Sequence, residues 1–265
     1  MKGFLLSFRS EFYKSRKTLG FWCAILLPLL ISLLAFSIFY TKSEKFAAMP
    51  SMALWSQFAT ISLGIMGTLL LPMFIIFIAY SVNSVEHKAD TWKTLFSLPL
   101  PRWSVYGAKF FYAVFLIFLS LGLFGLFTIA FGNLLGVLKP ELKFNGYHME
   151  QQLMLIYFKL FLASLGILSL QFLFSLLWAD FLKPMGIGFI ATIAGVIAAS
   201  NNWEYAYLFP YSHPMAALRS MVKHSKGPVR NLEIDVFTKD VYVSLAIATV
   251  VFVAGYFIVQ KRSVK

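Results

Sequence analysis

The chain has 265 residues, of which 59% are hydrophobic and 13% are charged, whereas a soluble domain has about 45–50% and about 25%. An ordinary soluble fold is therefore excluded. The formal net charge of +12 would suggest nucleic acid as the partner of a soluble protein. Here the basic residues lie in tails and loops beside apolar runs, which favours the lipid bilayer as the partner and argues against nucleic acid.

Six apolar runs are long enough to cross a bilayer, for which a helix needs about 20 residues. They cover residues 19–40, 59–82, 106–136, 153–178, 184–200 and 241–260. Six such helices use about 120 residues, so no loop is long enough for an enzyme domain of the usual ~100–200 residues. The sequence predicts an all-α integral membrane protein whose residues 1–265 form a single transmembrane domain.

The distribution of Lys and Arg predicts how these helices are oriented, because cytoplasmic loops carry an excess of basic residues. The two tails and the connections after the second and fourth runs carry 13 of them, and the other three connections carry nine. Both termini are therefore expected in the cytoplasm, as six crossings require.

Residues 1–18 are predicted to form an amphipathic helix. One face carries Phe4, Phe8 and Phe12, and another carries Lys2, Arg9 and Arg16. Such a helix is suited to lying in the cytoplasmic interface of the membrane. The alternative is a basic anchor that only fixes the orientation of the first span.

Residues 83–102, between the second and third runs, are predicted to contain a short cytoplasmic helix. Asn83 followed three residues later by Glu86 has the form of a helix N-cap with its reciprocal carboxylate. The helix would carry an apolar stripe of Val85, Ala89, Trp92 and Phe96, and the polar residues Glu86, His87, Asp90 and Lys93 on its other sides. Pro99 and Pro101 would end it. We expect its charges to face the cytosol; the alternative is a helix that only rests on headgroups.

Residues 201–240 form the longest polar region, on the extracytoplasmic side. Aromatic residues occupy every second position at its start, namely Trp203, Tyr205, Tyr207, Phe209 and Tyr211. This spacing is typical of an aromatic belt at the headgroups. A gate over a translocation path is the alternative. After Pro214, an apolar stripe predicts a short, half-buried helix.

The sequence offers little catalytic chemistry. It has no G-x-x-x-x-G-K-[ST] loop for a nucleotide, and its four histidines lie in separate loops without metal-ligand spacing. We therefore expect no catalytic, cofactor or metal site, and any ATP hydrolysis must come from another subunit.

Charge is also scarce within the spans. Lys159 is the only charged residue well inside an apolar run, whereas ion-coupled carriers need buried charges. Ser164, Ser169, Gln171 and Ser175 lie on the same span, where hydrogen bonds between helices explain such residues better than a substrate site.

The run Glu86-His87-Lys88-Ala89-Asp90-Thr91-Trp92-Lys93-Thr94-Leu95, with Ser97-Leu98-Pro99-Leu100-Pro101-Arg102 and the later Lys109, resembles the segment between spans two and three of ABC-2 type permeases. It is most similar to the branch that contains lantibiotic-immunity and bacitracin-resistance permeases. The order of elements along nearly the whole chain is similar as well. The chain departs from that branch in its 29 Phe residues and its Pro99-Leu100-Pro101 spacing.

The resemblance implies that residues 83–102 are a coupling segment that docks on a separate ATP-binding subunit, which holds ATP and Mg. The implied contacts are Glu86, His87, Asp90, Trp92 and Lys93, together with Arg9, Glu11 and Lys14 of the N-terminal helix. It also implies an outer re-entrant gate after Asn201, for which the candidates are Tyr207, Phe209, Pro210 and Pro214.

The expected function is thus that of a permease subunit, not an enzyme, in the cytoplasmic (inner) membrane of a bacterium. It would pair with itself or a related permease and with two ATP-binding subunits, and would export an amphiphile such as an antimicrobial peptide, a lipid-like molecule or a drug. The alternatives are an ion-coupled secondary transporter or channel, and a membrane scaffold or sensor subunit without cargo. We also expect Glu86→Lys with Asp90→Lys to weaken ATPase association without unfolding the chain.

Overall fold

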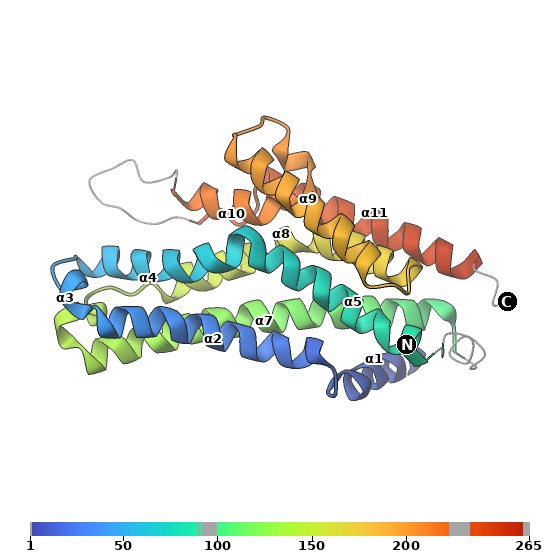
Figure 1. Cartoon of the computed structure of the whole chain (residues 1–265), viewed down its shortest axis with the longest axis horizontal. Coiled ribbons are helices and arrows are strands. Elements are labelled where there is room, and N and C mark those ends of the chain that lie inside the picture. Colours follow the sequence, from blue (N-terminus) through green and yellow to red (C-terminus); the bar gives the residue numbers. More distant parts are fainter. Residues whose placement is uncertain (1, 90, 92–99, 223–233, 262–265) are drawn as a thin grey trace.

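The computed structural model describes residues 2–89, 91, 100–222 and 234–261, which form helices and no strand (Figure 1). Within this part of the chain, six helical stretches are long and apolar enough to cross a membrane. They are Leu19–Thr41 (α2), Ser51–Ala89 (α4, η1 and α5), Arg102–Leu138 (α7), Glu150–Leu177 (α8), Leu182–Ser200 (α9) and Lys239–Lys261 (α11). The predicted all-α fold with six spans is confirmed.

Shorter elements precede or connect these spans. They are α1 (Lys2–Ser15), α3 (Ser43–Phe46), η2 (Pro140–Leu142), η3 (Phe144–Gly146), η4 (Ala206–Leu208), η5 (Pro210–Ser212) and α10 (His213–Val222). The predicted helices at the N-terminus and after Pro214 correspond to α1 and α10. Helix α1 lies within the expected range 1–18, and α10 begins at His213, next to Pro214.

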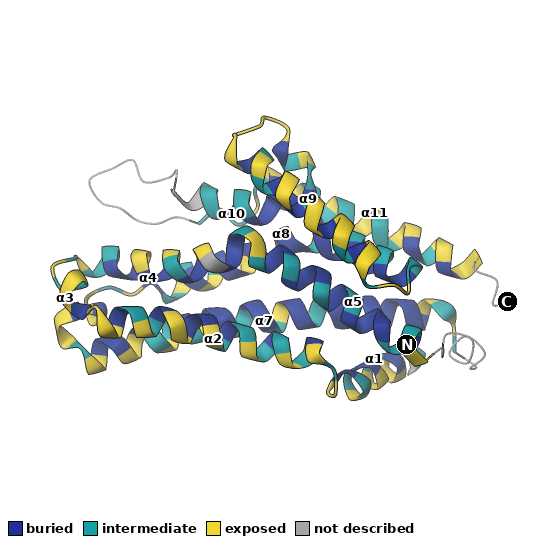
Figure 2. Cartoon of the chain, viewed as in Figure 1, coloured by how far each residue is buried: buried dark blue, intermediate teal, exposed yellow. Residues whose placement is uncertain are grey.

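Helices α7 and α8 pack together at the centre of the bundle; α1 and α2 pack against α7, and α5 and α11 pack against α8. Buried residues are concentrated on these inner faces (Figure 2). The start of α1, the end of α5, the start of α7 and the end of α11 lie at one end of the bundle, which we call the terminal end (Figure 1). The other end is called the distal end.

The second span is longer than its hydropathy predicts and contains an irregular turn. It runs through α4 (Ser51–Ile65), a π turn η1 (Met66–Leu70) and α5 (Leu71–Ala89). Pro72 follows the π turn, and because it has no N–H it cannot complete the ordinary ladder of hydrogen bonds there. Leu218 of α10 occupies the space beside Gly67, where a Cβ atom would overlap it. The π turn therefore seats α10, which belongs to the connection between α9 and α11. We call this connection, residues 201–238, the distal connection.

Aromatic packing closes the distal end. Trp55 is fully buried, and its Nε1–H donates a hydrogen bond of 3.0 Å to the carbonyl oxygen of Phe144. The ring of Phe144 lies edge-to-face against Trp55 at 5.1 Å and against Phe58 at 5.9 Å. These contacts fold the connection between α7 and α8 back onto α4.

The prediction that a helix begins at Asn83 is wrong. Helix α5 continues without a break from Leu71 to Ala89, so Asn83 lies inside it and caps nothing. Its side-chain Nδ2 donates instead to Ser175 Oγ of α8 at 2.8 Å. The same Nδ2 also donates to the carbonyl oxygen of Ala79 within α5 at 3.2 Å. The amide therefore links α5 to α8 and does not cap a helix.

Candidate functional site

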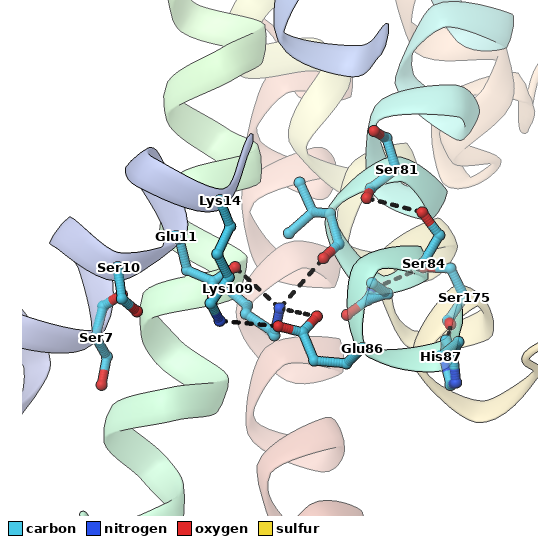
Figure 3. Close-up of polar contacts among 12 residues, drawn as sticks. Ser7, Ser10, Glu11, Lys14, Ser81, Ser84, Glu86, His87, Lys109 and Ser175 are labelled. Carbon is cyan, nitrogen blue, oxygen red and sulfur yellow. Dashed lines mark hydrogen bonds and ion pairs between the residues drawn. The ribbon is translucent and has the colours of Figure 1, made fainter. Parts of the chain in front are cut away.

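Four charged side chains from three helices meet at the terminal end (Figure 3). The ammonium group of Lys109 on α7 donates to Glu11 Oε2 at 2.9 Å, to Glu86 Oε2 at 2.5 Å and to the carbonyl oxygen of Val82 at 3.2 Å. The ammonium group of Lys14 on α1 donates to Glu11 Oε1 and Glu86 Oε1, both at 2.9 Å. Each carboxylate thus binds both lysines, and we call Glu11, Lys14, Glu86 and Lys109 the charge ring.

The sequence of α1 positions Glu11 for this contact. Ser7 and Glu11 lie one helical turn apart on the face that packs against α7, and both are buried. On the same side, the ring of Phe8 lies edge-to-face against Tyr112 at 5.9 Å. These contacts lay α1 along α7 and bring Glu11 within reach of Lys109.

The charge ring is electrically neutral and largely removed from solvent. The exposed fractions of Lys109, Glu86 and Glu11 are 0%, 2% and 3%. Burying an isolated ion costs several kcal/mol, but here each of the three ammonium protons of Lys109 has an acceptor. The ring is stable as a set, so loss of one member leaves a buried charge uncompensated.

Lys14 is the most accessible member, with a side chain 31% exposed. Burial alone would lower the pKa of Lys14, but the carboxylates of Glu11 and Glu86 outweigh it and raise the pKa above its ordinary value. Lys14 therefore carries its charge at neutral pH.

The end of α5 is also fixed to α8. Besides the bond from Asn83, His87 Nε2 lies 3.0 Å from the carbonyl oxygen of Ser175, and Ser175 Oγ donates to the carbonyl oxygen of Ala79 at 2.9 Å. The last turns of α5 are therefore tied to α1, α7 and α8 together. The expectation of hydrogen bonds between helices is confirmed for Ser175, whereas Ser164 and Ser169 bond within α8.

The structure corrects the expected orientation of Glu86, which does not face the cytosol but lies buried in the charge ring. A lysine at this position would place a third ammonium group beside Lys109 and Lys14. Glu86→Lys is therefore expected to unfold the chain, contrary to the prediction made from the sequence. A role of Glu11, Lys14 and Glu86 in ATPase coupling remains a prediction, and the structure assigns them to an internal contact.

The other expected ATPase contacts are not brought together in the described residues. His87 is half-buried and bonded to α8, while Arg9 is exposed on the opposite side of α1 from Glu11. Asp90, Trp92 and Lys93 lie outside the described residues. Lys109 was missed as a site residue, although an acidic residue at the end of one span and a lysine two turns inside the next are a signal for a buried pair.

The distal connection folds into a compact turn between α8, α9 and α11. Pro210 and Pro214 are buried, and Tyr207 and Phe209 are half-buried. The hydroxyl of Tyr211 in η5 accepts a hydrogen bond from Gln171 Nε2 of α8 at 2.6 Å, so Gln171 ties its span to this connection. The four gate candidates thus share one packed segment, whereas Trp203 and Tyr205 remain about half exposed, at 53% and 52%. The aromatic residues of this segment thus differ in exposure, and both the aromatic belt and the gate remain predictions.

Acidification is expected to loosen this connection through His213. Its Nε2 lies 2.8 Å from the carbonyl oxygen of Tyr207. Burial lowers the pKa of His213, although the Tyr207 carbonyl and the Asp240 carboxylate oppose the shift. A histidine whose pKa is lowered on folding favours the folded state above its ordinary pKa of about 6.5, and this stability is lost as the pH falls. The midpoint temperature of thermal unfolding should therefore fall more between pH 7.5 and pH 5.5 for the native chain than for His213→Gln. Equal falls in the two chains would contradict this assignment.

In the described part of the chain, no three His, Cys, Asp or Glu side chains come close enough to hold a metal ion. The charge ring also lacks a free carboxylate oxygen, since all four oxygens of Glu11 and Glu86 accept from lysine. Its arrangement is suited to holding helices together rather than to proton transfer or ligand binding.

A comparison with protein families matches residues 7–195 to a model described as an ABC-2 family transporter protein. The chain belongs to the ABC-2 transporter family. No curated protein and no solved structure matches this ABC-2 protein. The match spans all four residues of the charge ring and ends within α9, before the distal connection. As an ABC-2 protein the chain is a membrane component of a transporter, and the family implies an ATP-binding partner in general.

Proposed function

We propose that this chain is the permease subunit of an ABC exporter that expels an amphiphile with ATP hydrolysed by a separate subunit. The observation that carries the proposal is the charge ring. The predicted coupling segment begins in the last turns of α5 and ends where α7 begins, and the charge ring ties these two helices to each other and to α1. A force applied to residues 83–102 would therefore move three helices together rather than bend one loop.

The proposed docking surface for the ATPase is the coupling segment, with His87, Asp90, Trp92 and Lys93 as its contacts. Glu11, Lys14 and Glu86 act behind this surface, where they hold the helices in register. In this mechanism ATP-driven closure of two ATPase subunits pushes the segments of two paired permeases and shifts a two-state equilibrium of the spans. The terminal end of the bundle would then face the cytoplasm of a bacterium.

A continuous path of contacts leads from this end to the distal connection. Helix α5 extends from Glu86 back to the π turn, and Leu218 of α10 packs beside Gly67 in that turn. Rigid-body motion of α5 would therefore reach α10, and through it the gate candidates Tyr207, Phe209, Pro210 and Pro214. This coupling supports an outer gate that responds to ATP.

The proposed cargo is amphiphilic, such as an antimicrobial peptide, a lipid-like molecule or a drug. The spans contain few charged groups, and Glu86 and Lys109 neutralise each other in the charge ring. A path between such helices suits an apolar group better than an ion, because charged ligands in a membrane require charged partners. The lantibiotic-immunity and bacitracin-resistance branch remains the proposed subfamily.

A charge exchange in the coupling segment tests the proposal. The tagged chain is purified in mild detergent from its native host, and ATP hydrolysis by the copurified complex is measured. Asp90→Lys with Lys93→Glu preserves the net charge but exchanges the acidic and basic positions. We expect the ATP hydrolysis that copurifies with the chain to fall about tenfold, equivalent to about 1.4 kcal/mol of binding free energy. The matched control is Glu44→Lys with Lys45→Glu at the exposed α3. Equal ATPase recovery with both variants would refute docking at this segment.

A further inference from the structure

The exposed face of α1 carries cations and leucines together. Helix α1 turns Phe4, Phe8 and Glu11 towards α7, contrary to the usual interfacial helix, whose apolar face enters the bilayer. The face turned away from α7 is lined by Leu5, Leu6, Arg9, Tyr13 and Arg16, all exposed. The exposed fractions of Leu5 and Leu6 are 65% and 62%. A face of this composition would be costly to leave in water.

Two guanidinium groups on this face share one aromatic ring. The Cζ atom of Arg9 lies 5.6 Å from the centre of the Tyr13 ring, and that of Arg16 lies 4.8 Å from it. Arg9 also donates a long hydrogen bond of 3.4 Å to the Tyr13 hydroxyl. Tyr13 thereby holds two like charges on one side of the helix.

These arginines have no acidic partner among the described residues, whose ion pairs involve neither of them. Glu11 is the only acidic residue in the first 43 positions of the sequence, and both of its oxygens are bound to Lys14 and Lys109. Lys17 adds a third exposed cation next to Arg16. The face is therefore complementary to anions supplied from outside the chain.

The next helix along the chain, α2, presents exposed apolar residues. Helices α1 and α2 both pack against α7, and exposed residues are seen along both (Figure 2). The exposed row of α2 begins with Leu19 and Trp22, which are 74% and 51% exposed. This exposed apolar row belongs to a membrane span and leads directly to the basic helix α1, which places α1 at the lipid headgroups. A soluble protein docked on α1 is less suitable, because it would leave Leu19 and Trp22 uncovered.

We propose that the exposed face of α1 binds the phosphate groups of anionic phospholipids, with Arg9 and Arg16 as the headgroup ligands. Leu5 and Leu6 enter the acyl boundary, and Tyr13 orients both guanidinium groups. Guanidinium pairs bind phosphate with bidentate geometry, which selects the phosphate over the rest of the headgroup. Because the opposite face of α1 carries Glu11, bound lipid stabilises the charge ring by fixing α1 against α7.

The test measures lipid binding by the full chain purified in detergent, with native mass spectrometry as the readout. Phosphatidylglycerol is the anionic probe, and phosphatidylcholine is the zwitterionic one. Each basic residue near a headgroup contributes about 1 kcal/mol, so we expect Arg9→Gln with Arg16→Gln to weaken phosphatidylglycerol binding about thirtyfold and leave phosphatidylcholine binding unchanged. The matched control is Lys183→Gln with Lys261→Gln, which removes two exposed charges at the same end of the bundle.

Further variants and a competing ligand distinguish lipid binding from the binding of free phosphate or of a protein. Arg9→Lys with Arg16→Lys keeps both charges but loses the guanidinium geometry. It is expected to bind phosphatidylglycerol more tightly than the Gln variant and more weakly than the native chain. Millimolar inorganic phosphate should not displace the lipid, because it lacks the acyl contacts of Leu5 and Leu6. The proposal is overturned if the Gln variant binds phosphatidylglycerol as the native chain does. It is also overturned if the Gln variant loses a copurified ATPase but not the lipid, since this face then docks a protein.

Discussion

Replacing Lys109 with methionine is expected to destabilise the chain by about 3–5 kcal/mol, the usual cost of breaking a buried ion pair from one side. The substitution leaves Glu11 and Glu86 buried at the terminal end with only Lys14, which is partly exposed, as their partner. Methionine fills a similar volume, so the loss reflects charge rather than a cavity. Unfolding of the purified chain in mixed detergent and dodecyl sulfate measures the change.

A compensating substitution separates the charge ring from simple packing. Lys109→Met with Glu86→Gln leaves Lys14 and Glu11 as one neutral pair, so the double variant is expected to be more stable than Lys109→Met alone. Residues in one network show coupling of about 0.5–3 kcal/mol in such a cycle. Lys45→Met, at an exposed position of α3, controls for the loss of a lysine. If the effects of Lys109→Met and Glu86→Gln simply add, the closed ring is not a unit.

Gly195→Ala is expected to displace the distal connection from α9. A Cβ atom on Gly195 would lie 2.5 Å from the carbonyl carbon and oxygen of Tyr211 and 2.8 Å from the amide nitrogen of Ser212. These are backbone atoms, so no side chain can rotate away, and the whole turn η5 must move. Overpacking of this kind costs about 1–3 kcal/mol, and occasionally more.

Helix α9 provides its own control for this prediction. A Cβ atom on Gly186 would meet no atom within 4 Å, so Gly186→Ala should be neutral or stabilising, since alanine favours a helix over glycine by about 1 kcal/mol. The readout is thiol labelling of Ala206→Cys in a chain with Cys23→Ala. Labelling should accelerate with Gly195→Ala and stay unchanged with Gly186→Ala. Equal labelling rates would show that η5 does not depend on its contact with α9.

The spans could be predicted from sequence because each apolar run is long enough to cross, or nearly cross, the hydrocarbon core of a bilayer, whatever its neighbours. The continuation of α5 to Ala89 could not be predicted from sequence, because Asn83 and Glu86 have the local pattern of a helix cap. Their true partners are distant in sequence: Ser175 is 92 residues from Asn83, and Lys109 is 23 residues from Glu86. Only tertiary packing decides between a cap and a buried contact.

The orientation of α1 shows a second limit of periodicity. The spacing of Phe4, Phe8 and Phe12 correctly predicts a helix with one aromatic face, but lipid tails and neighbouring helices are equally apolar. The pattern therefore does not distinguish insertion in the bilayer from packing against α7. The charge ring was hidden for a related reason, because its four residues are ordinary surface residues until three helices bring them together.

The candidate site thus differs in kind from the one expected. The sequence indicated a charged helix facing an ATPase, whereas the described residues show acidic groups turned inward, where they join the helices behind the coupling segment. Docking and transmission are in this view separate tasks: His87, Asp90, Trp92 and Lys93 are the proposed contacts, and the charge ring carries the motion to the spans.

The distance between two spin labels at the distal end tests this transmission most directly. The labels are attached at Trp203→Cys and Lys42→Cys, both exposed, in a chain with Cys23→Ala that is purified with its ATPase and measured with and without ATP. We predict that ATP shifts the distance distribution in this chain, and that Lys14→Met abolishes the shift while ATP hydrolysis continues. An ATP-driven shift of the same size in the Lys14→Met variant, or no shift with the intact charge ring, would contradict the account.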